Sequence, residues 1–146
     1  MNISKRKPLT IVYVNFSPYE NAGRILDFLL SEYATVISFT FNFHRLSGTH
    51  DKSVLKEYVN GKLLNTRFLY YLPTPKNIAF LILPIRSVII FLQIILYLFV
   101  INKKYGTPDL YFTVNAFTAW CGIIGKKLGL VKKIIFWVGQ SVRKSQ

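Results

Sequence analysis

The stretch LTIVYVNFSPYENAGRILDFLLSEYATVISFTF, residues 9–41, is the part of the sequence that decides the predicted fold. It begins at 9–14 with β-branched and aromatic residues, the pattern of a strand buried on both faces. Turn-forming residues at 15–23 precede an apolar helical stripe over 25–30, and a second strand pattern follows at 35–41. Two strands joined by a helix form a right-handed parallel unit, whose ligands bind at the carboxyl ends of the strands. We therefore expect the functional edge at 15–23.

The rest of the chain continues this alternation of strand and helix patterns. The elements that we expect after residue 41 are a polar loop at 42–52, a short amphipathic helix at 51–59 that Asn60 and Gly61 end, a strand at 66–72, a helix at 84–104, a strand at 110–114, a helix at 116–130 and a strand at 132–138. Together these elements predict an α/β fold, a doubly wound and mostly parallel five-stranded Rossmann-like sheet with helices on both faces. We read residues 1–146 as a single domain of this kind.

The formal charge of the chain is +13 at neutral pH, and its distribution indicates the kind of partner. Residues 1–57 carry seven basic and five acidic side chains, whereas residues 58–146 carry twelve basic and one acidic. The second part is also very apolar, which matches an anionic membrane surface better than nucleic acid, so we expect no nucleic-acid partner. The single cysteine, Cys121, excludes an intrachain disulfide, and we expect it in the core. We expect a cytoplasmic protein, peripheral to the inner face of the plasma membrane.

The apolar segment at 78–101 allows three readings. As a membrane span it would separate the later strands from the first two, and Arg86 would be costly in the bilayer. As a crossover helix it would be buried inside the domain. As an interfacial helix it would pack on the sheet with one side and enter the membrane surface with the other, which nearby lysines favour. These lysines are Lys103, Lys104, Lys126, Lys127, Lys132 and Lys133.

Candidate substrate-binding residues follow the carboxyl ends of three expected strands. They are Asn15, Ser17, Ala22, Gly23, Arg24, Asn115, Gly139 and Gln140. Gly23 allows close backbone approach to a ligand, and Arg24 has the fork geometry that grips phosphate oxygens. The alternatives are an ordinary strand–helix turn around Gly23, a solvated Arg24, and a helix cap at Asn115.

The sequence carries no recognisable catalytic constellation, and Ser-His-Asp, phosphate-loop and Cys-x-x-Cys patterns are absent. His44 and His50 lie in a polar loop beside Asp51 without a third well-spaced ligand, so we expect neither a metal nor a cofactor. Either histidine could act as a general base, and the alternative is that both are solvated.

Three stretches resemble the N-terminal half of GT-B glycosyltransferases of family 4. Asn21-Ala22-Gly23-Arg24-Ile25-Leu26 is similar to the family's glycine-containing loop, which usually has two glycines. Residues 108–115, PDLYFTVN, resemble its Pro-Asp-apolar strand. Residues 122–137, GIIGKKLGLVKKIIFW, resemble its helix–glycine–strand return, so that the resemblance spans nearly the whole chain.

The resemblance implies the acceptor-side half of an enzyme of hexosyltransferase type. Such an enzyme transfers sugar from a nucleotide sugar to a lipid-linked or glycan acceptor, as in polysaccharide biosynthesis. Family members bind the nucleotide sugar in a second domain with a paired-glutamate motif, which this chain lacks, and residues 139–141 replace an acidic or His-Asp element. We therefore expect a nucleotide-sugar-binding domain or subunit as partner, and little or no transferase activity from the chain alone. The alternative is a non-catalytic peripheral membrane or protein-interaction domain.

Overall fold

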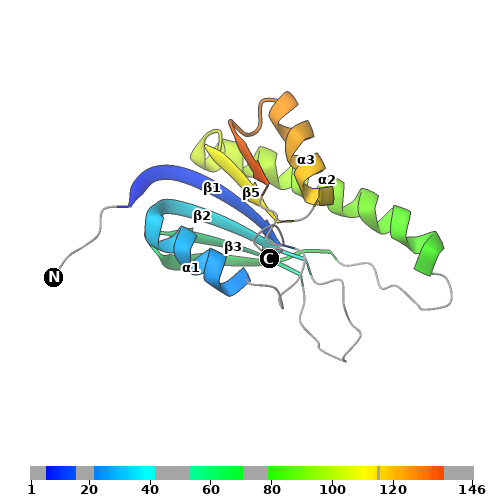
Figure 1. The fold of residues 1–146 in the computed structure, drawn as a ribbon, viewed down its shortest axis with the longest axis horizontal. Helices are drawn as coiled ribbons and strands as arrows, with labels where there is room; N and C mark the ends of the chain where they lie inside the picture. Colours follow the sequence, from blue (N-terminus) through cyan, green and yellow to red (C-terminus); the bar gives the residue numbers. More distant parts are fainter. Residues whose placement is uncertain (1–5, 16–21, 42–52, 71–78, 115, 137–146) are drawn as a thin grey trace, which may run out of the picture.

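The computed structural model describes residues 6–15, 22–41, 53–70, 79–114 and 116–136. The elements, in chain order, are β1 (Lys7–Asn15), α1 (Ala22–Glu32), β2 (Tyr33–Thr40), β3 (Val54–Val59), β4 (Lys62–Phe68), α2 (Ala79–Tyr105), β5 (Leu110–Thr113), α3 (Ala116–Lys127) and β6 (Ile134–Phe136). Figure 1 shows a twisted sheet with α1 against one face and with α2 and α3 against the other.

The strands follow the order β4-β3-β2-β1-β5-β6. β1 pairs in parallel with β2 on one side and with β5 on the other, and β6 continues the parallel arrangement beyond β5. β3 and β4 add antiparallel strands at the β2 edge. The predicted α/β class, the parallel β1–α1–β2 unit and the helices on both faces are confirmed. The sheet is mixed and has six strands in the described part of the chain, where we expected five mostly parallel ones.

The expected helix at 51–59 is wrong, because Val54–Val59 forms β3. Asn60 (φ 53°) and Gly61 (φ 80°) both adopt the left-handed backbone region, which gives a two-residue turn that leads back into β4. A turn of this kind requires positive φ at both positions, and Asn-Gly is the pair that supplies it most easily. β4 consequently begins at Lys62, before the strand that we expected at 66–72.

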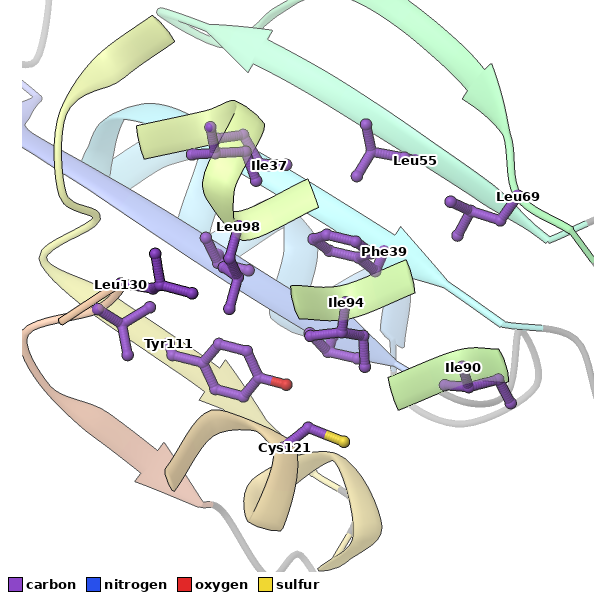
Figure 2. Close-up of a cluster of buried hydrophobic side chains, with 14 of the residues drawn as sticks. Ile37, Phe39, Leu55, Leu69, Ile90, Ile94, Leu98, Tyr111, Cys121 and Leu130 are labelled. Carbon is purple, nitrogen blue, oxygen red and sulfur yellow. The ribbon is translucent and has the colours of Figure 1, made fainter. Parts of the chain in front are cut away.

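The larger hydrophobic cluster lies between the sheet and the helices α2 and α3. Figure 2 shows the α2 side chains Ile94 and Leu98 beside those of the strands, and Tyr111 of β5 between Leu98 and Cys121 of α3. The labelled members are Ile37, Phe39, Leu55, Leu69, Ile90, Ile94, Leu98, Tyr111, Cys121 and Leu130. The smaller cluster lies under α1 and consists of Ile11, Tyr13, Leu29 and Val36. Both clusters take alternate residues of β1 and β2, as expected for strands covered on both faces.

Helix α2 is 27 residues long, about 40 Å at about 1.5 Å per residue, and only part of it packs on the sheet. Its buried residues, Ile90, Ile94, Leu98 and Ile101, follow the spacing of one helical face. From residue 80 to 89, no side chain whose exposure the structure describes is buried. In Figure 1 this amino-terminal part of α2, drawn in green, extends past the strands.

Candidate functional site

The carboxyl edge of the parallel strands contains a topological switch point between β1 and β5. β2 and β5 lie on opposite sides of β1. α1 follows β1 and packs on one face of the sheet, whereas α3 follows β5 and packs on the other face. In α/β sheets generally, ligands bind outside the carboxyl ends of the strands, at the point where helices from adjacent strands go to opposite faces.

Buried polar side chains stand on both sides of this switch point. Asn15 ends β1 and is buried, and its carbonyl oxygen accepts a hydrogen bond from the Phe41 N–H at 2.8 Å. Thr113 ends β5, and its hydroxyl is hydrogen-bonded to the hydroxyl of Thr118 in the first turn of α3. Both threonines are fully buried, so they form a polar pair inside an otherwise apolar interior, near the carboxyl edge.

Tyr111 fixes α3 against β5. Its hydroxyl donates a hydrogen bond of 2.8 Å to the carbonyl oxygen of Thr118, and its ring is fully buried. A Cβ on Gly122 would lie 2.5 Å from the Tyr111 ring, so the absence of a side chain there allows the helix to approach. Burial raises the pKa of Tyr111 well above its usual range, which keeps the hydroxyl protonated as a donor.

Cys121 belongs to the core, as expected from its place on the apolar side of its helix. It is fully buried, and burial raises the pKa of its thiol to about 12. A thiol in this state has no reactive thiolate at neutral pH, so we assign it a packing role.

The predicted substrate-binding residues are only partly placed by the structure. Asn15 is buried at the end of β1, and Arg24 is exposed in the first turn of α1. Ala22 and Gly23 form the start of α1. Ser17, Asn115, Gly139 and Gln140 lie outside the described residues, as do His44, His50 and Asp51.

The sequence analysis missed Thr113 and Thr118, which the fold brings together at the predicted edge. The available signal was a pair of threonines in two consecutive elements, one at the end of an apolar strand and one in the first turn of the following helix. They are five positions apart in the chain, and the strand-to-helix turn makes them neighbours.

A second polar cluster, at the carboxyl end of α2, has a structural role. The Glu57 carboxylate accepts hydrogen bonds of 2.8 Å from Lys104 and from the Tyr105 hydroxyl, and one of 3.3 Å from Asn65 across the hairpin. Burial pushes the pKa of Glu57 upward, but these donors outweigh it, and the pKa lies below its usual value. The cluster therefore connects α2 to the β3–β4 hairpin.

Asp109, part of the stretch that resembles a Pro-Asp strand, also has a structural role. One carboxylate oxygen accepts the Thr10 N–H at 2.9 Å, and the other lies 3.2 Å from the Lys132 ammonium. The residue joins the starts of β1 and β5 to the segment that leads into β6. This position is at the amino edge of the parallel strands, opposite the switch point.

The side of α2 that faces away from the sheet is apolar and exposed. This helix is long and apolar enough to cross a membrane by length and composition, although its buried side packs on the sheet. Among the described residues, no group of three or more His, Cys, Asp or Glu side chains could hold a metal ion.

Comparisons with protein-family models, with curated proteins and with solved structures found no match to this chain. The glycosyltransferase resemblance therefore stays a prediction, which rests on the three stretches of sequence that carry it.

Proposed function

We propose that this chain is the acceptor-side domain of a sugar transferase with a two-domain GT-B arrangement. The acceptor, a lipid-linked phosphate or a glycan, would bind at the carboxyl edge between β1 and β5. A separate nucleotide-sugar-binding domain or subunit would supply the donor. In this proposal the parallel strands β2, β1, β5 and β6 correspond to the Rossmann-like core of the acceptor-side half.

The observation that carries the proposal is the switch point between β1 and β5. Asn15 and Thr113 end the two strands there, and Thr118 lies in the first turn of α3. These side chains are buried, so in this proposal they hold the strand ends and the helix in place, and the acceptor would bind at the surface beside them. Arg24 adds an exposed guanidinium in the first turn of α1, where the helix N-terminus also favours negative charge.

A short, water-soluble acceptor analogue tests this proposal without a membrane. Geranyl diphosphate should bind the chain, with saturable perturbation of backbone amide NMR signals that includes residues 15, 24 and 113. A nucleotide sugar such as UDP-glucose should not bind, because donor binding belongs to the other domain. Geraniol and inorganic diphosphate, tested separately, show whether the tail or the phosphates carry the binding.

Arg24→Ala provides the matched variant. Loss of a charge-assisted contact to phosphate should weaken geranyl diphosphate binding about tenfold or more, since such contacts contribute about 1.5–3 kcal/mol. Lys62→Ala, which removes an exposed cation from the start of β4 at the opposite edge of the sheet, should leave the affinity unchanged. Equal affinity of Arg24→Ala and the wild type, or tight binding of UDP-glucose, would contradict the proposal.

A non-catalytic membrane or protein-interaction domain is the second candidate, and the exposed apolar side of α2 favours it. Eight large apolar side chains of this helix are exposed: Phe80, Leu81, Ile85, Val88, Leu92, Leu96, Phe99 and Val100. Surface binding through this helix, together with no response to any diphosphate at the carboxyl edge, would support the second candidate over the first.

A further inference from the structure

The outer side of α2 carries a continuous stripe of large apolar residues. Its members are Leu81, Ile85, Val88, Leu92, Leu96 and Phe99, which we call the outer stripe. They recur every three or four residues, so they lie along one line of the helix. Each is at least half exposed, whereas the opposite side of the same helix is buried on the sheet. A monomeric soluble protein rarely exposes a contiguous apolar surface of this length.

Helix α3 widens this surface. Trp120 and Ile123 are exposed, and the Trp120 ring lies 5.6 Å from that of Phe91 on α2, centroid to centroid. Further along, a Cβ on Gly125 would contact Leu98 of α2. The two helices therefore approach each other at successive positions and run in the same general direction. We call the outer stripe together with Trp120 and Ile123 the apolar face.

Lysines lie at the carboxyl ends of both α2 and α3. Lys103 follows Phe99 by one helical turn, and Lys127 follows Ile123 by one turn; both lysines are exposed. From residue 79 to 136 the sequence has seven basic side chains and one acidic, Asp109. Asp109 is paired with Lys132 at 3.2 Å. The apolar face is thus bordered by positive charge, and Asp109 is the one acidic side chain in this part of the sequence.

We propose that the apolar face docks on the surface of an anionic bilayer, with α2 lying along the interface. The apolar side chains would enter the boundary between headgroups and acyl chains, and the lysines at the helix ends would contact anionic headgroups. This docking rests on packing and charge alone and does not depend on the proposed sugar transfer.

Two other ways to cover the apolar face, a membrane-spanning α2 and a second copy of the chain, fit less well. A spanning α2 would draw the sheet that covers Ile90, Ile94 and Leu98 into the hydrocarbon, where the exposed edges of β4 and β6 would lose hydrogen bonds to water. A second copy of the chain would bring together two surfaces bordered by lysines, on molecules that each carry a formal charge of +13. An anionic membrane satisfies both the apolar and the cationic groups.

The docked orientation would bring the carboxyl edge close to the leaflet. The Gln93 side chain is hydrogen-bonded to the backbone of Tyr70, just after β4, at 2.7 and 3.0 Å. This contact marks where α2 passes the carboxyl edge of β4, and the amino-terminal end of α2 projects beyond the strands (Figure 1). Under the proposed function, an acceptor anchored in the same leaflet would emerge beside the switch point.

Flotation with vesicles tests the docking, and two matched variants separate surface position from hydrophobicity. Leu96 in the outer stripe is 62% exposed and Leu64 on β4 is 61% exposed, so a glutamate at either position replaces an exposed leucine and is not buried in the core. The wild type should float with vesicles of phosphatidylcholine and phosphatidylglycerol. Leu96→Glu should lower the partition coefficient about tenfold or more, and Leu64→Glu should leave it within about twofold.

The lysines are tested on the same vesicles. Lys103→Gln and Lys127→Gln should each weaken binding about fivefold at low salt, and the loss should shrink as salt screens the charges. Lys62→Gln, an exposed lysine at the start of β4, serves as the control and should have no effect. In a Trp137→Phe background, the emission of Trp120 should shift to the blue on vesicle binding.

Equal flotation of Leu96→Glu and Leu64→Glu would overturn the proposal, as would equal binding to pure phosphatidylcholine. A wild type that leaves vesicles unbound and forms a dimer that Leu96→Glu dissociates would assign the apolar face to a second copy instead. Geranyl diphosphate binding that survives Leu96→Glu would show that acceptor binding and membrane docking are separate, so that either proposal can fail without the other.

Discussion

Replacement of Gly122 by alanine tests how tightly α3 is held against β5. The new Cβ would lie 2.5 Å from Cε1, 2.6 Å from Cδ1 and 3.2 Å from Cγ of Tyr111. Ordinary carbon–carbon contacts are about 3.5–4.0 Å, so relief requires a shift of about 1 Å. The ring is fully buried, and its hydroxyl is held by the Thr118 carbonyl at 2.8 Å, so it cannot turn away without breaking that bond.

The expected cost follows from these contacts. Overpacking a buried site costs about 1–3 kcal/mol, and a weakened buried hydrogen bond adds about 1 kcal/mol. Alanine recovers about 1 kcal/mol because it is a better helix former than glycine. We therefore expect Gly122→Ala to lower the free energy of unfolding by about 2 kcal/mol, which corresponds to a fall in Tm of about 4–8 °C.

Urea unfolding followed by tryptophan fluorescence and by far-ultraviolet circular dichroism measures this change. Gly125→Ala is the control, because it makes the same substitution in the same helix. The Cβ at residue 125 would lie 3.0 Å from a terminal methyl of Leu98, which can move by a few tenths of an ångström. Its effect should stay within about 0.5 kcal/mol of zero. A Gly122→Ala protein as stable as Gly125→Ala would refute the tight packing of α3 on Tyr111.

Three further substitutions test the contacts that connect the elements. Glu57→Gln should lower the free energy of unfolding by about 1–2 kcal/mol at pH 7. Because the folded-state pKa of Glu57 is lowered, its contribution is present above the unfolded pKa near 4.5 and is lost as the pH falls through the folded value. The stability curves of the wild type and the variant should therefore converge in acid, and a constant gap between them would contradict this assignment. Asp109→Asn should lower the free energy of unfolding by about 1–2 kcal/mol, because it weakens the contacts to Thr10 and Lys132. NMR should show changed amide shifts at the starts of β1 and β5. No change in stability or in these shifts would exclude the bridging role. Gly61→Ala should destabilise by about 1 kcal/mol because residue 61 has φ of +80°, whereas a neutral effect in thermal unfolding would mean that the turn accommodates a side chain without strain.

Local patterns in the sequence predict much of the parallel part of the sheet. Runs rich in β-branched and aromatic residues surround Val12 and Ile37, and an apolar helical stripe lies between them. These patterns produce the parallel β1–α1–β2 unit. The later strand–helix–strand pattern likewise produces β5, α3 and β6, with boundaries that differ by a few residues. These elements are recognised because residues close in sequence already show the period of a strand or a helix.

The hairpin shows where periodicity misleads. Val54, Leu55, Tyr58 and Val59 fit one face of a short helix as well as they fit two faces of a strand. The structure divides them, with Leu55 in the cluster under α2 and Tyr58 beside the cluster under α1. Pairing with β2 decides the matter, since six residues gain more hydrogen bonds and contacts in a sheet than in an isolated helical turn.

By itself, the sequence determined the α/β class, the parallel opening unit and the presence of a long apolar helix followed by lysines, because each depends on residues that are near one another in the chain. Tertiary structure alone decided which side of α2 is buried. Nearly every side of that helix is apolar from residue 79 to 101, so no polar face marks the side that meets water. Tertiary structure also brought Thr113, Tyr111 and Thr118 together, because the contact requires the turn between β5 and α3 and the close approach that Gly122 permits.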